Sequence, residues 1–480
     1  MTIDGDYVAD LAVVGAGPAG LAATVTALSH GLRVTFVDSG SQVGGQFWRH
    51  PPRGSALPEH PEQHHDLETY RSLCRHLEHY ASIGRLRVLL EHDVWTAERS
   101  SEPLKFAIHA VDRSRPPTRA CAITVRARAM LVATGAFDRP MPFEGWDLPG
   151  VYTAGALQAL LKGGGVVAGG RVVVGGTGPF LLPVAVGLAQ AGARVVAVCE
   201  ASTAAAWLPR LGAVARVPGK LGEGAQYAAE LIRRRIPVYQ RHVVVRAHGT
   251  DRVEAVTVAR VDSAGTRVPG AERTLEADAV GVGWGFVPRL DLALTLAAGV
   301  EAGSDGTEVL TVDSSQHTSV AGLFAAGEVT GIGGAALALA EGRIAGEAAS
   351  AFLGALGAST ARPRRVARDV VRHRAFAEAM SAAHPVPTDL LSALPDETLV
   401  CRCEEVDAGA VRSAMDGGAR DARQVKQLTR AGMGWCQGRM CTAAVECLLG
   451  GRGGGVVERL VAAPVPLGAL ALRDSADDAM

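Results

Sequence analysis

The chain has 480 residues, of which 48 are Lys or Arg and 49 are Asp or Glu, so its formal net charge is −1. A charge balance this close to zero argues against partners that bind through a global positive field, such as nucleic acid or anionic lipid. The hydrophobic fraction of 48% is typical of a globular protein, and the length is enough for two or three domains with sizeable cores.

No membrane span and no export signal is predicted. The longest apolar runs are interrupted by glycine and resemble strands. Residues 1–10 are acidic and lack the basic region of a secretory signal. We therefore expect a reducing, cytoplasmic location, and peripheral association with the inner face of the membrane stays open.

The chain is organised around a glycine turn at residues 15–20. An apolar run leads into the turn, a helical pattern follows it, and a second apolar run ends in Asp38. In such a unit Gly15 permits the tight turn, Gly17 lets the backbone approach a pyrophosphate, and Gly20 lets the helix pack on the strand. Asp38 is placed to accept from ribose hydroxyls. The dinucleotide contacts predicted here are Gly15, Ala16, Gly17, Pro18, Ala19, Gly20, Asp38 and Ser39.

Two small-residue segments come next in this first unit. The paired glycines of Gly44-Gly45-Gln46 let the backbone lie flat against a planar ligand. Short β runs over residues 86–132 end in Ala133-Thr134-Gly135, a strand closing on a small-residue turn that a cofactor can approach. Both segments are predicted to contact the same cofactor as the glycine turn.

Seven of the 14 histidines lie between residues 50 and 92. His60, His64 and His65 resemble metal ligands in isolation, but no cysteine or carboxylate spacing completes a recognisable site. We interpret this stretch as a polar loop followed by an exposed helix over residues 67–80.

A second unit repeats the first one. A strand over residues 171–174 leads into Gly176 and Gly178, but Leu181 occupies the place of the third glycine. The leucine should push the helix away from the strand and narrow the phosphate cleft. The next strand ends in Glu200, which could hold a ribose, and no arginine for a 2′-phosphate follows it. The site would therefore prefer NAD, or an ATP-like adenosine nucleotide without a 2′-phosphate, over NADP. A scaffold whose nucleotide site is lost or reassigned stays equally open.

Further strands are predicted over residues 253–261 and 275–282. A third strand then ends in Gly327-Glu328, before a helix from about residue 333 to residue 352. A helix N-terminus beside a carboxylate suits a phosphate and a polyol chain. The arginine-rich stretch over residues 361–383 is interpreted as a solvated connecting helix rather than a nucleic-acid patch.

The C-terminal region contains a cysteine framework of the form C-x-C, 32 residues, C-x4-C. Its thiolates are supplied by Cys401, Cys403, Cys436 and Cys441. Four thiolates in two close pairs can hold a [2Fe-2S] cluster or a Zn²⁺ ion, and C-x-C is tighter than zinc knuckles usually use, so we favour the cluster. Cysteines without a closely spaced partner are not predicted to be ligands: Cys74, Cys121, Cys199 and Cys447.

These segments together resemble known flavoproteins. The glycine turn with Asp38, then Gly44-Gly45-Gln46, Ala133-Thr134-Gly135 and Gly327-Glu328, resemble the two-dinucleotide-domain family of glutathione-reductase type. The cysteine module resembles the bacterioferritin-associated-ferredoxin type of [2Fe-2S] domain. The combination is similar to the larger (α or A) subunits of heteromeric, NAD-independent amine dehydrogenases: opine oxidases, D-hydroxyproline and proline dehydrogenases, and hydrogen cyanide synthase.

The resemblance implies an α/β fold with two Rossmann-like dinucleotide-binding domains and a small helical [2Fe-2S] domain. The FAD domain would comprise residues 1–150 and 288–357 and would be split by a second, degenerate nucleotide domain over residues 151–287. A linker helix at 358–395 and the cluster domain at 396–480 would follow. Two departures are Glu328, where the family has Asp, and Leu181. No redox C-x-x-C or C-x4-C lies near Gly45 or in residues 176–280, which excludes disulfide reductase activity.

The implied function is electron transfer inside a hetero-oligomeric, FAD-dependent oxidoreductase that acts on an amino acid or secondary amine. A flavin accepts two electrons and a [2Fe-2S] cluster accepts one at a time, so a chain with both converts between the two modes. The sequence offers no convincing catalytic base, and the resemblance implies a smaller FAD-containing partner of amino-acid-oxidase type that oxidises the substrate. Two further components that it allows are a small ferredoxin-like subunit, and FMN at a contact between subunits.

Two alternatives remain from the sequence. One is a self-contained NADH-dependent reductase with NAD at Gly176, Gly178 and Glu200 and the cluster as electron outlet. The other is a non-catalytic scaffold or redox-sensing subunit that binds FAD structurally.

Overall fold

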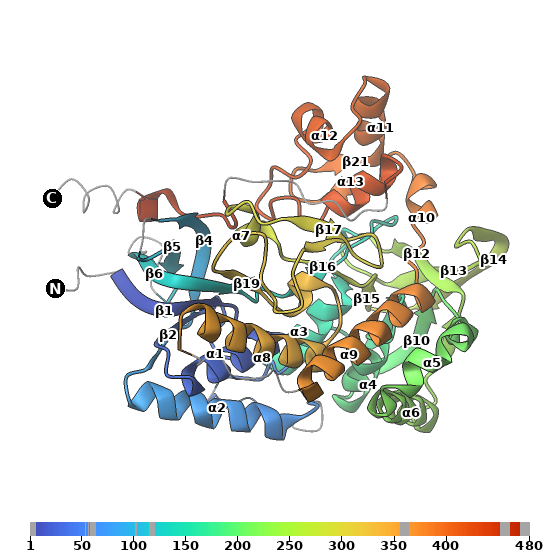
Figure 1. Ribbon diagram of the computed structural model, residues 1–480. Helices are drawn as coiled ribbons and strands as arrows, with labels where there is room; N and C mark the ends of the chain where they lie inside the picture. The colour runs from blue at the N-terminus through green and yellow to red at the C-terminus, as the bar shows by residue number, and fades with distance from the viewer. Residues whose placement is uncertain are drawn as a thin grey trace.

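The computed structural model describes residues 6–52, 54–55, 57, 64–100, 103–114, 121–355, 364–451 and 461–470. It confirms the predicted α/β fold with two Rossmann-like units and a small C-terminal domain (Figure 1). His60 lies outside the described residues, as does the side chain of Cys121.

The first Rossmann unit is made from both ends of the flavoprotein region. Its elements are β1 (Asp6–Val14), α1 (Pro18–Ser29), β2 (Val34–Val37), α2 (Leu67–Ser82), β3 (Leu86–Leu89), β4 (His92–Arg99), β5 (Phe106–Asp112), β6 (Cys121–Val132), α7 (Asp291–Leu294), β17 (Val300–Ala302), β18 (Glu308–Leu310), β19 (Leu323–Ala325), the 3₁₀ turn η4 (Glu328–Thr330) and α8 (Ala335–Phe352). The sheet runs β3-β2-β1-β6 in parallel, with β19 also paired to β6 and with β5 and β4 added as an antiparallel meander. The central strands β1 and β6 supply buried residues to two hydrophobic cores, one on each face of the sheet.

The second unit consists of β8 (Val151–Thr153), α3 (Ala154–Gly164), β9 (Arg171–Gly176), α4 (Leu181–Gln190), β10 (Arg194–Glu200), η3 (Ala204–Arg210), α5 (Leu211–Ala215), α6 (Pro218–Arg233), β11 (Val238–Gln240), β12 (His242–His248), β13 (Ala255–Val261), β14 (Arg267–Glu276) and β15 (Ala279–Gly283). Its parallel sheet has the order β11-β10-β9-β15-β8, and a separate antiparallel sheet has the order β12-β13-β14. The sequence analysis predicted one strand over residues 275–282, and this prediction was wrong. The run consists of the end of β14 and most of β15. The chain changes sheet at Asp278, whose carboxylate accepts from the Arg171 backbone N–H at 2.9 Å.

Two antiparallel strands connect the units. These are β7 (Ala136–Asp138), which leaves the first unit, and β16 (Phe286–Pro288), which returns to it. The crossing places Arg289 directly beside the end of β6, since its backbone N–H donates to the Gly135 carbonyl at 2.9 Å.

The linker helix α9 (Arg364–Ala383) packs along α8 and ends near β10 (Figure 1). The C-terminal domain follows it and lies above α7 and β17 in the same view. Its elements are α10 (Asp389–Ser392), β20 (Leu399–Cys401), β21 (Val406–Asp407), α11 (Ala408–Asp416), α12 (Ala422–Thr429) and α13 (Thr442–Leu448). Its hydrophobic core is continuous with that of the second unit, because Val400 and Val411 belong to the same buried cluster as Trp146 and Val243.

Candidate cofactor sites

The glycine turn between β1 and α1 is the place where the predicted cofactor segments meet. A Cβ on Gly15 would collide with the Ala133 carbonyl, and a Cβ on Gly20 would collide with the Gly15 carbonyl. On the other side, a Cβ on Gly327 would come within 2.9 Å of the Ala19 Cβ. The first and third glycines are therefore required by backbone contacts within the protein.

Gly17 differs from these two glycines because a Cβ built on it would meet no atom within 4 Å. It is the N-cap of α1, and its carbonyl accepts from the Leu21 N–H at 3.0 Å, so the helix begins with α-type geometry. Open space at the positive end of a helix is what a pyrophosphate needs. The turn therefore fits a dinucleotide such as FAD.

The paired glycines support the turn from behind. The Gly44 N–H donates to the Ala16 carbonyl at 2.8 Å, and a Cβ on Gly45 would lie 2.8 Å from Gly17 Cα. Gln46 is exposed, and its Oε1 accepts from Arg49 Nε at 3.0 Å. The sequence did not indicate this packing role, and contact of the pair with a flat ligand stays a prediction.

Asp38 follows β2 beside the turn. Its Oδ2 accepts from the Ala16 N–H at 2.5 Å and its Oδ1 from the Gly40 N–H at 2.6 Å. Burial raises the pKa of Asp38, and these two N–H groups oppose the rise. Since a carboxylate has about four acceptor positions, capacity for ribose hydroxyls remains. Ser39 beside it is exposed.

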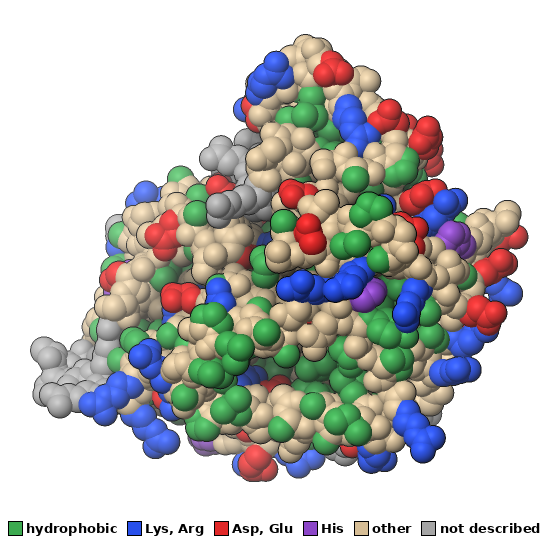
Figure 2. Space-filling model, turned by 90° about the vertical axis from the view of Figure 1, so that its right-hand side faces the viewer, with side chains coloured by type: hydrophobic (Ala, Val, Ile, Leu, Met, Phe, Trp, Pro, Cys, Tyr) green, Lys and Arg blue, Asp and Glu red, His purple; other side chains and the backbone are tan. Residues whose placement is uncertain are grey.

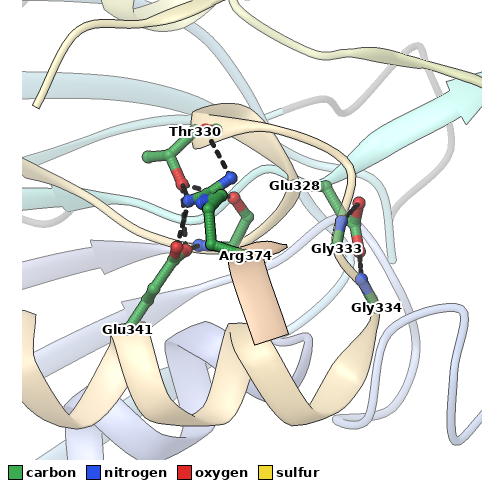
Figure 3. Close-up of polar contacts among 7 residues, drawn as sticks. Glu328, Thr330, Gly333, Gly334, Glu341 and Arg374 are labelled. Carbon is green, nitrogen blue, oxygen red and sulfur yellow. Dashed lines mark hydrogen bonds and ion pairs between the residues drawn. The ribbon is translucent and has the colours of Figure 1, made fainter. Parts of the chain in front are cut away.

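The late acid has its partners within its own loop. Glu328 Oε1 accepts from the Gly334 N–H at 2.9 Å and Oε2 from the Gly333 N–H at 3.1 Å, so the carboxylate lies at the N-terminus of α8 (Figure 3). Desolvation by the surrounding protein raises the pKa of Glu328 to about 7. The extra methylene of Glu lets it reach the helix end, where the sequence predicted a carboxylate beside a helix N-terminus.

A buried charge network behind this loop was not predicted. Glu341 on α8 has no exposed surface, and its Oε2 accepts from the Gly327 N–H and from Thr330 Oγ1, both at 2.9 Å. Arg374 of α9 forms an ion pair with Glu341 and donates to the Thr330 carbonyl at 2.9 Å (Figure 3). The arginine-rich stretch therefore includes at least one residue that fixes the loop at Gly327, and α9 is more than a solvated connector.

Arg289 is a second residue that sequence reasoning missed. Its carbonyl accepts from Thr134 Oγ1 at 2.7 Å, which ties it to the segment at residues 133–135. Burial lowers the pKa of the Arg289 guanidinium, which also senses the charges of Arg439, Asp291 and Asp38. The desolvated guanidinium therefore lies within electrostatic range of Asp38, beside the turn predicted to bind the cofactor.

The second glycine turn is built differently from the first. The helix α4 begins at Leu181, whereas α1 begins at Pro18, which corresponds in spacing to Pro179. Leu181 N–H donates to the Gly178 carbonyl and Leu182 N–H to the Pro179 carbonyl, each at 3.2 Å, so the first turn is of the tighter 3₁₀ type. The buried Leu181 side chain packs against Gly283 at the end of β15. A glycine at position 181 would leave this space free.

Glu200 already has four donors around it. Its carboxylate accepts from Thr177 Oγ1 and the Ser202 N–H at 2.9 Å each and from the Gly178 N–H at 3.0 Å. His384, just past α9, places Nδ1 3.4 Å from Oε1. A carboxylate has about four acceptor positions, so a ribose can bind Glu200 only after His384 leaves.

Trp207 on η3 holds His384 in this position. Its indole N–H donates to His384 Nε2 at 3.0 Å, which leaves the ring proton on Nδ1 and directs it to Glu200. The Trp207 ring also stacks on Phe376 of α9, with centroids 5.7 Å apart. The end of α9 therefore covers the place where the sequence predicted a nucleotide ribose.

The histidine-rich stretch makes contacts of a structural kind. A ring nitrogen of His65 lies 2.5 Å from Tyr227 Oη on α6 and 3.8 Å from a Glu223 oxygen. The helix predicted to be exposed is α2, which buries Tyr70 and Leu77 on one face. The contacts of His65 join the first unit to the second one.

The four predicted ligand cysteines gather in two pairs. The thiol of Cys441 donates to Cys401, and Cys403 is hydrogen-bonded to Cys436, so each pair joins one residue of C-x-C to one of C-x4-C. Within the described residues, no group of three or more Cys, His, Asp or Glu side chains is arranged around a single metal position. Two separate sulfur pairs fit a cluster in which each iron takes two protein ligands.

The electrostatics of the first pair favour the thiolate form of Cys401. The hydrogen bond from Cys441 lowers the pKa of Cys401 to about 5, helped by backbone N–H groups of Gly432 and Glu404, and the same bond raises the pKa of Cys441. Thiolate is the form that binds metal. Burial instead raises the pKa of Cys199 to about 12 and that of Cys447 to about 11, as for inert core thiols. Cys74 is buried in α2.

The visible surface carries no dominant charge. Acidic and basic side chains are interspersed on the face seen in Figure 2, and no large area of one sign covers it. In the described part of the chain, no helix has the length and the apolar character needed to cross a membrane.

Comparisons with known proteins identify the family of each of the two regions. Residues 9–342 match the model of the pyridine nucleotide-disulphide oxidoreductase family, and residues 399–450 match the BFD-like [2Fe-2S] binding domain. The A subunit of opine oxidase from Rhizobium meliloti is 32% identical over 92% of each chain. Hydrogen cyanide synthase subunit HcnB of Pseudomonas aeruginosa is 32% identical over 89% of this chain and 90% of its own.

A solved structure shows the same fold. The L-proline dehydrogenase from P. horikoshii superposes with a TM-score of 0.66 at 19% identity, covering 97% of this chain and 80% of that chain. The match extends across both Rossmann-like units and the C-terminal domain.

Proposed function

Because this chain belongs to the pyridine nucleotide-disulphide oxidoreductase family and carries a BFD-like [2Fe-2S] domain, we propose that it is the electron-transferring subunit of a heteromeric dehydrogenase. The enzyme is a FAD-dependent oxidoreductase that acts on CH–NH donors of the opine, hydroxyproline, proline or glycine class. The chain passes electrons between a flavin and a [2Fe-2S] cluster.

One observation carries the proposal. The same chain has a glycine turn with open space at Gly17 and two thiol pairs that fit one binuclear cluster. FAD supplies two-electron chemistry and the cluster supplies one-electron chemistry when they are bound. The residues of this chain hold the two groups, with Asp38 beside the turn and Cys401, Cys403, Cys436 and Cys441 around the cluster.

The proposal includes a partner that oxidises the amine. Relatives at about a third identity are named as subunits of opine oxidase and hydrogen cyanide synthase, which supports an assembly of several chains. We propose a smaller FAD-containing subunit of amino-acid-oxidase type, and a small ferredoxin-like protein is a further component. The location proposed is the cytoplasm, free or against the inner face of the membrane, and cell fractionation would test it.

The proposal includes two further cofactors, an adenosine nucleotide and FMN. An adenosine nucleotide, NAD or ATP-like, would bind at Gly176, Gly178 and Glu200 once His384 has moved. An FMN would lie at the contact with the partner. Nucleotides released by denaturing the purified assembly, separated by chromatography, would identify either one.

The NADH-dependent reductase is the second candidate function, and the contacts of Glu200 disfavour it. The deciding experiment is to purify the chain with its native partners and to screen opines, hydroxyproline, proline and glycine under anaerobic conditions. Substrate should bleach the flavin and then give the EPR signal of a reduced cluster. Bleaching of the isolated chain by NADH, with no response to any amine, would favour the reductase instead.

A further inference from the structure

The loop that carries two of the cluster cysteines also touches the FAD-binding unit. Arg439 lies between Cys436 and Cys441, and its Nη1 is 3.5 Å from the Cys436 carbonyl. Its Nη2 donates to Asp291 Oδ2 at 3.2 Å and to the Ala462 carbonyl at 2.7 Å. The ligand loop is thus attached to α7 through one side chain.

The partner of Arg439 is firmly held. Asp291 is 8% exposed and begins α7, and Arg289, two residues before it, contacts Thr134 and Gly135 through its backbone. Ala462, the other acceptor, donates its own N–H to the Trp95 carbonyl on β4 at 2.7 Å. Arg439 therefore reaches two elements that are fixed to the first Rossmann unit.

The geometry of the pair between Arg439 and Asp291 differs from that of a second ion pair near the cysteines, between Arg430 and Glu404. Arg430 Nε lies 2.9 Å from Glu404 Oε2, but the Arg430 side chain is 68% exposed and both residues belong to the cluster domain. The Arg439 side chain is 19% exposed and crosses from that domain to the FAD-binding unit. Exposed pairs contribute little, whereas removal of one partner from a desolvated pair leaves a charge unpaired.

We propose that Arg439, through Asp291, is a positioning residue that fixes the cluster loop against the FAD-binding unit and so sets the rate of electron transfer between the two. This inference rests on the proposed function, because it presupposes flavin and cluster in one chain. The rate of electron transfer falls steeply as the distance between flavin and cluster increases. If the loop is released from α7, we therefore expect slower transfer even when the cluster is complete.

The test compares four variants with the full wild-type chain. R439Q and D291N each remove one partner of the contact. Because D291N changes no residue of the cluster domain, slower transfer in this variant would not result from incomplete cluster assembly. R439K keeps a cation and should restore part of the contact. R430Q removes the exposed pair beside Cys403 and serves as the matched control.

Two measurements are made on each variant. The first is the rate of cluster reduction after the flavin is reduced by a light pulse, with iron and FAD content determined on the same sample. The second is hydrogen exchange at the amides of residues 289–294 and 436–441 in iron-free protein, which reports docking without the cluster. We expect R439Q and D291N to slow transfer about tenfold or more and to exchange faster at both segments, with R430Q like wild type and R439K between.

The outcomes separate the two proposals. Wild-type transfer rates in D291N and R439Q with full iron content would overturn the positioning role and leave the proposed function intact. Unchanged exchange in both segments would overturn it as well. A wild-type chain that transfers no electrons between flavin and cluster would overturn the proposed function itself.

Discussion

At the scale of single residues, the turn between β1 and α1 is explained by what each glycine contacts. Gly15 and Gly20 are required by neighbouring backbone, whereas Gly17 faces open space that we predict the cofactor occupies. Asp38 stands beside them; its Oδ2 accepts from Ala16 of the turn, and its Oδ1 accepts from Gly40 in the loop that follows. Its removal therefore affects both the turn and the ribose.

We predict that Asp38→Ala weakens FAD binding about ten- to a hundredfold, because a hydrogen bond to a charged group contributes roughly 1.5–3 kcal/mol. FAD retained through dialysis and the dissociation constant measured by fluorescence quenching would show it. Ser29→Ala, at the exposed end of α1 and outside the predicted cofactor contacts, is the control. Full retention of FAD by the Asp38 variant would refute the ribose contact.

The raised pKa of Glu328 should make the free energy of unfolding depend on pH. Its pKa is raised to about 7 in the folded protein by desolvation, while an unfolded glutamate titrates near 4.3. The folded state therefore binds more protons between these values, and stability falls as pH rises from about 4.5 to about 7. Glu341, whose pKa burial also raises, adds to the same trend.

We expect Glu328→Gln to reduce the loss of unfolding free energy over this pH range by a few kcal/mol at most. The part of the loss due to Glu341 should remain. Thermal unfolding of cofactor-free protein at pH 5, 6, 7 and 8 is the measurement. Glu272→Gln, on the exposed part of β14, is the control. A wild-type melting temperature that rises steadily from pH 5 to pH 7 would contradict the assignment.

At the scale of elements, α9 is the feature with most influence on the sites. Arg374 near its middle fixes the loop at Gly327, and His384 just past its end covers Glu200. The two contacts lie on opposite nucleotide units. One helix thus holds the first site in shape and closes the second.

We predict that NADH reduces the flavin of the wild-type chain slowly or not at all, because Glu200 is occupied and Leu181 has altered the first turn of α4. His384→Ala combined with Leu181→Gly should bind NADH at least tenfold more tightly. Stopped-flow absorbance and titration of Trp207 fluorescence would measure both effects. His373→Ala on the same helix leaves the contact with Glu200 in place and is the control. Rapid reduction of wild type at micromolar NADH would overturn this explanation.

Much of this arrangement was predictable from the sequence, and the reasons for the rest are physical. The glycine spacing predicted the strand–turn–helix units and the cysteine spacing predicted the four-thiol framework, because each depends on local geometry, and the resemblance to known flavoproteins supplied the fold class. The network of Glu341 and Arg374 joins residues 33 positions apart on two helices, and no local pattern encodes it. His384 precedes a proline in the sequence, which gives no sign that its ring reaches Glu200. The pairing of Cys401 with Cys441 likewise depends on how the loop folds back.

At the scale of the whole molecule, the proposal makes a claim about metal content. Serine at Cys401, Cys403, Cys436 or Cys441 should remove the visible absorption and the reduced-state EPR signal of the cluster while FAD stays bound. Wild type should contain about two iron atoms per chain. Serine at Cys447, a half-buried thiol on α13, is the control. One zinc and no iron in anaerobically prepared protein would contradict the cluster and the electron transfer built on it.

The core shared by the cluster domain and the second Rossmann unit has a consequence for how such chains exchange parts. Trp146, which lies between β7 and β8 and belongs to this core, donates its indole N–H to the Leu399 carbonyl at 2.6 Å, and Arg402 lies over the same ring. Replacing residues 396–450 by those of a distant relative would change the residues that contact Trp146 at positions 399 and 402. We therefore expect a functional chimaera to need Trp146 and its contacts to be transferred together with the cysteines.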